Sequence, residues 1–237
     1  MTKHSRRILK PPVYYHDLEQ GTEEWHKIRS GLITASTFSR LITTRTFQPA
    51  NNETSRKLCH QILAERLTGI VEETYQSDAM LRGSMEEDIA RQLYTEHRQE
   101  VRKCGFVTRQ NRGVTIGYSP DGLVGNHGLI EIKRPKQENQ IARILADKIP
   151  DEYFWQIHEG LAVTGRRWCD FVSYAPNLPL MIYRVRASPE INTAIWNAAI
   201  AAENSIKEME KQIRMLAKTR KYPPTKPLIT VTATPWD

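Results

Sequence analysis

The sequence predicts an α/β (α+β) fold in which a central mixed β-sheet is flanked by helices. Three observations predict it. Apolar residues recur at helical spacing through much of the first hundred residues. Short segments rich in β-branched and aromatic residues then follow one another, separated by turn-forming residues. A helical pattern interrupts these segments once and returns after them, which is the element order of a sheet with helices packed on its faces.

The first helical segments begin at recognisable caps. Thr22 precedes two glutamates, a pattern typical of a helix start. Trp25 and Ile28 follow at helical spacing, and we expect Trp25 in the core. A second short helix is expected after Thr34. Residues 43–54 are polar and predict a loop.

Two longer helices are expected before the strands. The apolar stripe in residues 56–68 stops at Gly69, a residue type that commonly ends helices. Residues 83–98 show the same helical period. The expected buried stripe of this second helix consists of Met85, Ile89, Leu93 and Tyr94.

The hydrophobic period changes after residue 100. Residues 151–164 and 189–218 predict two further helices, the second of which begins at Ser188 and Pro189. The segments with the composition of β-strands are residues 103–109, 114–118, 129–133, 169–175 and 180–186.

The length of 237 residues suits one large domain. We expect an extended N-terminal lead over residues 1–16, because Pro11 and Pro12 oppose helix formation. A single domain is expected over residues 17–220, followed by a proline-rich tail over residues 221–237.

The charge of the chain points to a polyanionic partner. The formal net charge is +7, which favours nucleic acid over a merely basic surface. Three widely spaced cysteines fit a reducing cytosol better than a disulfide scaffold, and they form no C-x-x-C pair for zinc. Neither a signal peptide nor a transmembrane run is recognisable, so we expect the protein to stay inside the cell that makes it.

The stretch SPDGLVGNHGLIEIKRP, at residues 119–135, carries the most specific chemistry. If residues 129–133 form a strand, Glu131 and Lys133 point to one face, away from the flanking isoleucines. Asp121 stands on a turn between a proline and a glycine, and a hairpin would bring it close to Glu131.

Two carboxylates beside one ammonium predict a site for phosphodiester hydrolysis. Neighbouring acids repel each other, and a divalent cation such as Mg²⁺ removes that conflict because it prefers oxygen ligands. A lysine can stabilise charge that develops on a phosphate. The alternative is a solvated hairpin face with an incidental Glu–Lys pair.

Three further blocks accompany this stretch. They are EQGTEEWHKIRSGLITAS at residues 19–36, GSMEEDIA at residues 83–90 and YFWQIHEGLAVTG at residues 153–165. Together with S-P-D-G…E-I-K, the blocks resemble the phage lambda exonuclease (YqaJ-like) family of alkaline exonucleases, within the PD-(D/E)-x-K nuclease superfamily. The resemblance implies a restriction-endonuclease-like core.

The resemblance also implies roles for individual residues. Lys133, Glu131, Asp121, Glu87 and Gln156 match the catalytic residues. Asp121, Glu131 and the backbone carbonyl of Ile132 match the metal ligands. Arg29 and Ser36 match residues that receive a 5′-terminal phosphate, for which a guanidinium is well suited. Met80 matches the position of a wedge that separates the strands.

Two departures leave questions open. The run Glu86-Glu87-Asp88 does not fix which acid faces the site, although Glu87 fits the glycine spacing. His158 stands where the family often has a second glutamine, so it either takes that polar role or changes the contacts with metal or substrate.

The implied activity is a Mg²⁺-dependent 5′→3′ exonuclease that digests one strand of linear double-stranded DNA to mononucleotides and leaves a 3′ overhang. Two Mg²⁺ ions are expected, with Mn²⁺ as a substitute. The resemblance further implies a homotrimeric ring, a single-strand annealing protein as partner, and a phage or prophage origin in the cytoplasm of a bacterial host. The alternatives are a structure- or site-specific endonuclease and a catalytically inactive DNA-binding protein.

Overall fold

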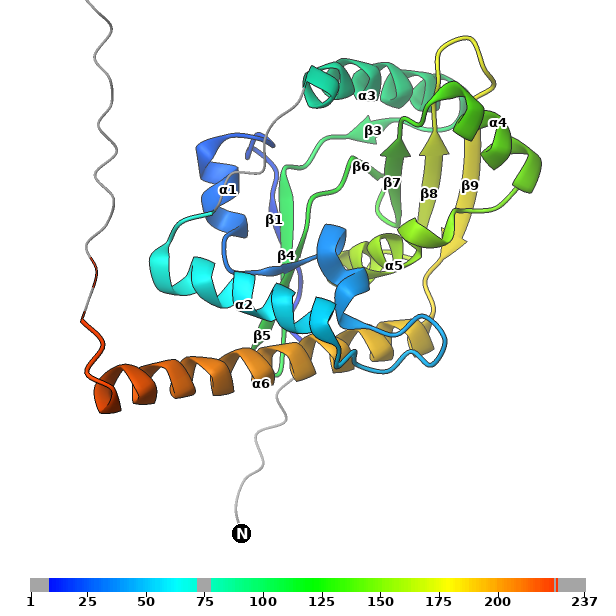
Figure 1. Cartoon of the computed structure of the whole chain (residues 1–237). Coiled ribbons are helices and arrows are strands. Elements are labelled where there is room, and N and C mark those ends of the chain that lie inside the picture. Colours follow the sequence, from blue (N-terminus) through cyan, green and yellow to red (C-terminus); the bar gives the residue numbers. More distant parts are fainter. Residues whose placement is uncertain (1–8, 72–77, 224, 226–237) are drawn as a thin grey trace, which may run out of the picture.

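The computed structural model describes residues 9–71, 78–223 and 225, and in the helix that begins at Asp78 it describes side chains from Met85 onward. Its elements lie in two β-sheets with helices packed on and between them (Figure 1). In chain order they are β1 (Val13–Tyr15), α1 (Glu23–Arg29), β2 (Ile33–Thr34), the 3₁₀ helix η1 (Ala35–Leu41), α2 (Glu53–Thr68), α3 (Asp78–His97), β3 (Val101–Arg102), β4 (Phe106–Asn111), β5 (Val114–Tyr118), β6 (Gly122–Val124), β7 (Gly128–Lys133), α4 (Gln137–Ala146), the 3₁₀ helix η2 (Asp151–Tyr153), α5 (Phe154–Thr164), β8 (Trp168–Ser173), β9 (Met181–Arg186) and α6 (Pro189–Thr219).

The larger sheet has the strand order β3-β6-β7-β8-β9 and is mixed. The hairpin β6–β7 is antiparallel, with Gly122 opposite Ile130. Strands β7 and β8 are parallel, and the chain between them crosses over through α4, η2 and α5, as a parallel pair requires. The smaller sheet, β1-β4-β5-β2, contains one parallel pair, β2 with β5.

The two faces of β7 pack against different layers. Ile130 and Ile132 join Ala90 and Tyr94 of α3 in one small core, so they point toward that helix. Leu129 belongs to the main core, which α5 shares with β4, β5, η1 and α6. The alternation of side chains along a strand therefore turns Glu131 and Lys133 away from α3, as the sequence predicts.

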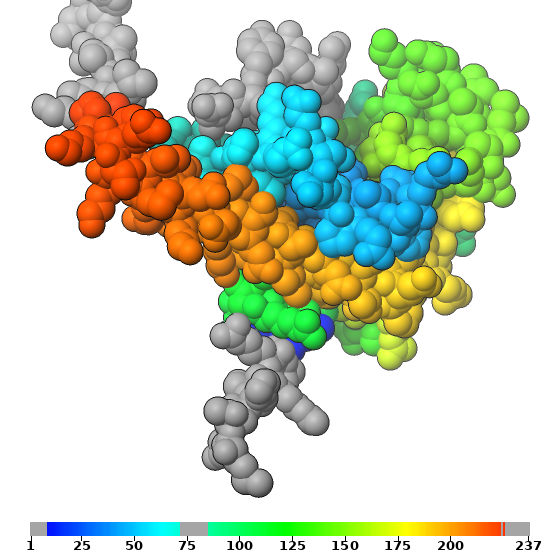
Figure 2. Space-filling view, turned by 60° about the horizontal axis from the view of Figure 1, so that its bottom comes forward, coloured from blue at the N-terminus to red at the C-terminus, as the bar shows by residue number. Residues whose placement is uncertain are grey.

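Helices α2 and α6 run side by side across one face of the molecule (Figure 2). Both nitrogens of the Arg66 guanidinium fork donate to Glu203, at 3.1 and 2.9 Å, and this bidentate pair joins the two helices. The buried residues of α6 are four alanines, Ala194, Ala198, Ala199 and Ala202, together with Ile195, Trp196, Glu203 and Ile206.

Most predicted helices are present with shifted ends. Thr22 caps α1 by accepting from the Trp25 N–H, and Gly69 ends α2 with a φ of 70°. The predicted stripe of α3 is partly wrong, because Met85 and Ile89 are 72% and 45% exposed while Ala90 and Tyr94 face the sheet.

Several elements were not expected, among them the short strands β2, β3 and β6. Strand β1 lies in the segment expected to be an extended lead, and it pairs with β4. Helix α4 occupies residues to which no element was assigned. The strand expected at residues 103–109 is shifted: β4 begins at Phe106 and ends at Asn111, and β3 lies before it at Val101–Arg102. No helix among the described residues is long and apolar enough to cross a membrane.

Candidate active site

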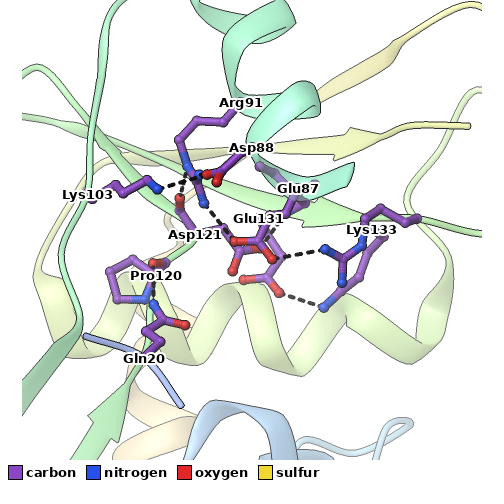
Figure 3. A network of polar contacts seen from close by, with 11 residues as sticks. Gln20, Glu87, Asp88, Arg91, Lys103, Pro120, Asp121, Glu131 and Lys133 are labelled. Carbon is purple, nitrogen blue, oxygen red and sulfur yellow. Dashed lines mark hydrogen bonds and ion pairs between the residues drawn. The ribbon is translucent and has the colours of Figure 1, made fainter. Parts of the chain in front are cut away.

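The hairpin β6–β7 places Asp121 against the strand that carries the other two charges. Asp121 Oδ2 accepts a hydrogen bond from the backbone N–H of Ile132 at 2.6 Å. Two side chains fix the turn from outside: Arg91 Nε donates to the Asp121 carbonyl at 2.9 Å, and Gln20 Nε2 donates to the Pro120 carbonyl at 3.1 Å (Figure 3). The position of the Asp121 carboxylate is therefore set by the backbone of β7 and by two distant segments.

Glu131 is 1% exposed and accepts three hydrogen bonds from side chains. Lys133 Nζ donates to Oε1 at 2.7 Å and Gln156 Nε2 donates to the same oxygen at 2.6 Å. The Tyr118 hydroxyl donates to Oε2 at 2.7 Å. Strand β5, strand β7 and helix α5 thus meet at one carboxylate, and their donors compensate its burial.

Lys133 remains a cation in this environment. Burial by itself lowers the pKa of Lys133, but the carboxylates of Glu131 and Asp121 outweigh it and raise the pKa above its ordinary value. The ring of Tyr153 lies 4.9 Å from Nζ and lines the same space.

Asp121 lies among acids. Burial raises its pKa well above the ordinary value, and the charges of Glu131 and Glu87 raise it further. Glu87, near the middle of α3, lines the pocket and accepts from Arg91 at 2.7 Å and from Arg134 at 3.2 Å. Glu86 is not among the lining residues, so Glu87 is the acid of the run that faces the site.

Arg29 lines the same pocket. Its Nη1 donates to Ser119 Oγ at 3.0 Å, and its guanidinium stacks over the Trp25 ring at 4.0 Å. Burial lowers the pKa of Arg29 to about 10, against the opposing effect of Glu159 and Glu65. Trp25, expected in the core, is half-buried and forms the wall beneath this guanidinium.

These groups share one pocket of about 450 Å³. The residues predicted from the sequence that line it are Arg29, Ser36, Glu87, Asp121, Glu131, Ile132, Lys133 and Gln156. His158 is not a lining residue: it is buried, with its ring 4.5 Å from that of Phe154. The side chain of Met80 lies outside the part that the structure describes.

Several lining residues have no counterpart among the predictions. Tyr118 and Tyr153 contact Glu131 and Lys133, as described above. Arg143 of α4 reaches the pocket and donates to Ser173 Oγ and to the Tyr153 hydroxyl, both at 3.1 Å. The helical spacing of Ile141, Ile144 and Leu145 was the signal that could have revealed this helix, and with it Arg143. The remaining unpredicted lining residues include Gln20, Ser119 and Arg134.

The donor set of the pocket suits Mg²⁺. A carboxylate offers about four acceptor positions, and the protein donors use three of those on Glu131. Asp121 Oδ1 has no hydrogen-bond donor among the described residues. No three His, Cys, Asp or Glu side chains of the described segments form a complete metal cluster. Mg²⁺ does not require a complete cluster of protein ligands, because it is commonly held by one or two carboxylates together with water and substrate phosphates.

Comparison with known proteins supplies the family. The family profile of the YqaJ-like viral recombinase domain matches residues 24–167. An alkaline exonuclease (LHK-Exo) from Laribacter hongkongensis is 32% identical, with a TM-score of 0.68 over 83% of this chain and 100% of that chain. The complex of LHK-Exo with dAMP gives a TM-score of 0.66 at the same identity and coverage.

A more distant structure supports the fold alone. It is a phage-related exonuclease from Haemophilus somnus 129PT, with 14% identity and a TM-score of 0.56 over 77% of this chain and 96% of that chain. No curated protein matches the sequence. The profile spans more than half of the chain, and LHK-Exo is related along most of it. The chain therefore belongs to the family defined by the YqaJ-like viral recombinase domain.

Proposed function

We propose that this protein is a Mg²⁺-dependent exonuclease that digests one strand of linear double-stranded DNA from its 5′ end. It releases mononucleotides and leaves a 3′ overhang for recombination by single-strand annealing. One observation carries the proposal: Arg29 lines the same pocket as Asp121, Glu131 and Lys133. A terminal nucleotide spans such a pocket, with its 5′-phosphate at the arginine and its 3′-phosphate at the acids. The related LHK-Exo has been captured with dAMP.

The acids and the lysine have different roles at the scissile phosphate. Asp121, Glu131 and the Ile132 carbonyl would hold Mg²⁺, which neutralises phosphate charge and makes a water molecule more acidic. Lys133 carries a positive charge at the edge of this group and stabilises the charge that develops on the phosphate oxygens. Gln156 and Tyr118 hold the Glu131 carboxylate in one orientation through their hydrogen bonds.

The contacts of Arg29 prepare its guanidinium to bind an anion. Its stacking on Trp25 and its bond to Ser119 fix the plane of the guanidinium. Nε and Nη2 donate to none of the described residues, so both are free for the two oxygens of a terminal phosphate. Ser36 lines the same pocket and offers its hydroxyl as a further donor.

The wider assembly rests on the family resemblance. We assign the nuclease to residues 17–220, with residues 1–16 as a lead and residues 221–237 as a tail. The active form is a homotrimeric ring around DNA, with Met80 as a strand-separating wedge and an annealing protein as partner. The net charge of +7 supports DNA as the substrate. The protein acts in the cytoplasm of a bacterial host, with a phage or prophage origin.

The test is nucleotide release from a linear duplex with a phosphate on only one 5′ end, in Mg²⁺. The native protein should digest the phosphorylated strand and leave a covalently closed circle intact. Lys133→Ala should abolish release, while Lys136→Ala, which removes an exposed lysine three residues away, should not. Cutting of the circle would favour an endonuclease. Binding without release from any substrate would favour an inactive DNA-binding protein.

A further inference from the structure

Helix α4 brings Arg143 to the pocket, where two nitrogens of its guanidinium are already bound. Nη1 donates to Ser173 Oγ and Nη2 donates to the Tyr153 hydroxyl, both at 3.1 Å. The guanidinium carbon lies 5.2 Å from the centre of the Tyr153 ring and 5.9 Å from that of Phe171. Because protein acceptors engage these nitrogens, Arg143 is not prepared as a phosphate ligand in the way that Arg29 is.

The two acceptors of Arg143 belong to separate parts of the chain that meet beside Lys133. Ser173 is the last residue of β8 and pairs with Lys133 across the parallel strands. Tyr153 ends η2, directly before α5. Arg143 therefore ties the crossover between β7 and β8 to the strand ends at which Lys133 stands.

The helix that carries Arg143 is itself fixed to the same strand end. Gln140, one turn before Arg143, is 0% exposed. Its Nε2 donates to the carbonyls of Ser173 and Pro179, both at 2.9 Å, and its Oε1 accepts from Ser173 Oγ at 2.6 Å. These buried bonds set the position of α4, and the Arg143 fork transmits that position to Tyr153.

Tyr153 in turn contacts Lys133. The centre of its ring lies 4.9 Å from Lys133 Nζ, within the range of a cation–π contact. Among the described residues, Nζ donates one hydrogen bond, to Glu131 Oε1 at 2.7 Å. A lysine has a flexible four-carbon stem, so a single bonded partner does not fix its ammonium. The Tyr153 ring supplies a second contact that restricts Nζ.

We propose that Arg143 is a positioning residue: by binding the Tyr153 hydroxyl, it keeps the Tyr153 ring against Lys133 and so fixes the ammonium where it serves the scissile phosphate. This inference rests on the proposed function, since it requires Lys133 to act on that phosphate. Arg143 acts on the reacting group and not on bound DNA. Its loss should therefore lower kcat and leave KM unchanged.

The experiment is a double-mutant cycle between Arg143 and Tyr153. It measures nucleotide release in Mg²⁺ from a linear duplex with a 5′-phosphate. Arg143→Met removes the guanidinium, and Tyr153→Phe removes the hydroxyl but keeps the ring. Each should lower kcat about tenfold, because a misplacement of about 1 Å in an active site can cost about 100-fold. The double variant should also lose about tenfold and not about 100-fold, because both changes break the same contact.

Two further variants separate positioning from charge. Arg143→Lys keeps the positive charge, but an ammonium cannot replace the planar fork that binds Ser173 and Tyr153 together, so kcat should again fall about tenfold. Lys148→Met removes an exposed positive charge from the same crossover and should leave kcat and KM at their native values. If urea unfolding shows that Arg143→Met does not fold, Arg143→Lys takes its place in the cycle.

The outcomes separate this inference from the proposed function. A raised KM with native kcat in Arg143→Met, restored in Arg143→Lys, would show that Arg143 attracts DNA directly and would overturn the positioning role. A loss of about 100-fold in the double variant would show that Arg143 and Tyr153 act independently, with the same consequence. The nuclease itself would stand in both cases. If native protein releases no nucleotide from any duplex, the proposed function is wrong and this inference is overturned with it.

Discussion

Asp121 and Ile132 are joined by a 2.6 Å hydrogen bond from the Ile132 backbone N–H to Asp121 Oδ2. The bond fastens the turn before β6 to the strand that carries Glu131 and Lys133. It leaves Oδ1 as the oxygen of Asp121 without a donor among the described residues. A backbone contact therefore brings the motif together and fixes one oxygen of Asp121.

Replacing Asp121 by Asn should lower the activity of the protein and raise its stability. Nucleotide release should fall more than about 100-fold, because even the residues that merely support metal ligands contribute 10–100-fold. The free energy of unfolding should rise, because burial and the neighbouring acids disfavour the ionised form of Asp121.

The raised pKa of Asp121 determines how the stability changes with pH. The favourable contribution of Asp121 is complete below the unfolded pKa of about 3.9 and is lost as pH rises through the folded pKa. The stability gained by Asp121→Asn should therefore grow with pH in urea unfolding without metal. An Asn variant that is less stable than native protein at pH 8 would contradict the assignment.

Mg²⁺ should stabilise the native fold through the same carboxylates. At a concentration 100 times the dissociation constant, a ligand that binds only the folded state contributes about 2.7 kcal/mol. The melting temperature of the native protein should rise on adding MgCl₂, and that of Asp121→Asn should rise much less. KCl at matched ionic strength is the control, and an equal rise in both salts would indicate screening of surface charge instead of binding.

The alternation in residues 129–133 was readable from the sequence because it depends only on strand geometry. Ile130 and Ile132 pack toward α3, and Glu131 and Lys133 lie on the opposite side, as predicted. Asp121 was readable because the hairpin connects it locally to the same strand. Arg29, Ser36, Glu87 and Gln156 lie far away in sequence, and only the family resemblance brought them into the prediction.

The residues missed by the sequence reach the pocket through contacts that no local pattern encodes. In the sequence, Tyr118 cannot be distinguished from other aromatic residues in strands. Its place in the pocket depends on the packing of β5 beside α5. Helix α4 was missed although Ile141, Ile144 and Leu145 recur at helical spacing. Its apolar residues are not a buried stripe, since Ile141 and Leu145 are 48% and 81% exposed. Arg143 was not predicted because it lies on this helix.

Gln156 should support the rate more than the affinity for DNA. Its amide donates to Glu131 Oε1 at 2.6 Å. Gln156→Leu removes this donor, and kcat should fall about 10- to 100-fold with little change in KM. Gln137→Leu, at an exposed position of α4, is the control and should leave kcat unchanged. A Gln156→Leu variant with native kcat would show that Lys133 and Tyr118 suffice to orient Glu131.

Asp170 should matter for stability because it links α3 to the sheet. The Tyr94 hydroxyl donates to Asp170 Oδ2 at 2.7 Å, and Arg184 donates to both of its oxygens. Asp170→Asn should lower the free energy of unfolding by about 2 kcal/mol, because the buried Asp170 loses its charged hydrogen bonds with the half-exposed Arg184. Tyr94→Phe should cost about 1 kcal/mol.

An exposed ion pair provides the comparison for Asp170. Glu210 and Arg214 lie one turn apart on α6, and Glu210→Gln should change the free energy of unfolding by less than about 1 kcal/mol. Urea unfolding of the variants would measure all these differences. If Asp170→Asn costs no more than Glu210→Gln, the buried network does not hold α3 against the sheet.

His158 should make the fold sensitive to acid. The side chain is 6% exposed, and burial lowers its pKa to about 4. A histidine with a lowered folded pKa contributes stability above its unfolded pKa of about 6.5, and that contribution is lost as pH falls toward 4. The loss is on the order of 3 kcal/mol, since each pKa unit corresponds to about 1.4 kcal/mol.

His158→Gln, which keeps a polar side chain but cannot take up a proton, should show a smaller decrease in unfolding free energy between pH 6.5 and 4. His127→Gln, at an exposed position of the β6–β7 turn, should retain the native decrease. Parallel pH profiles for the native protein and His158→Gln would show that the acid sensitivity arises elsewhere.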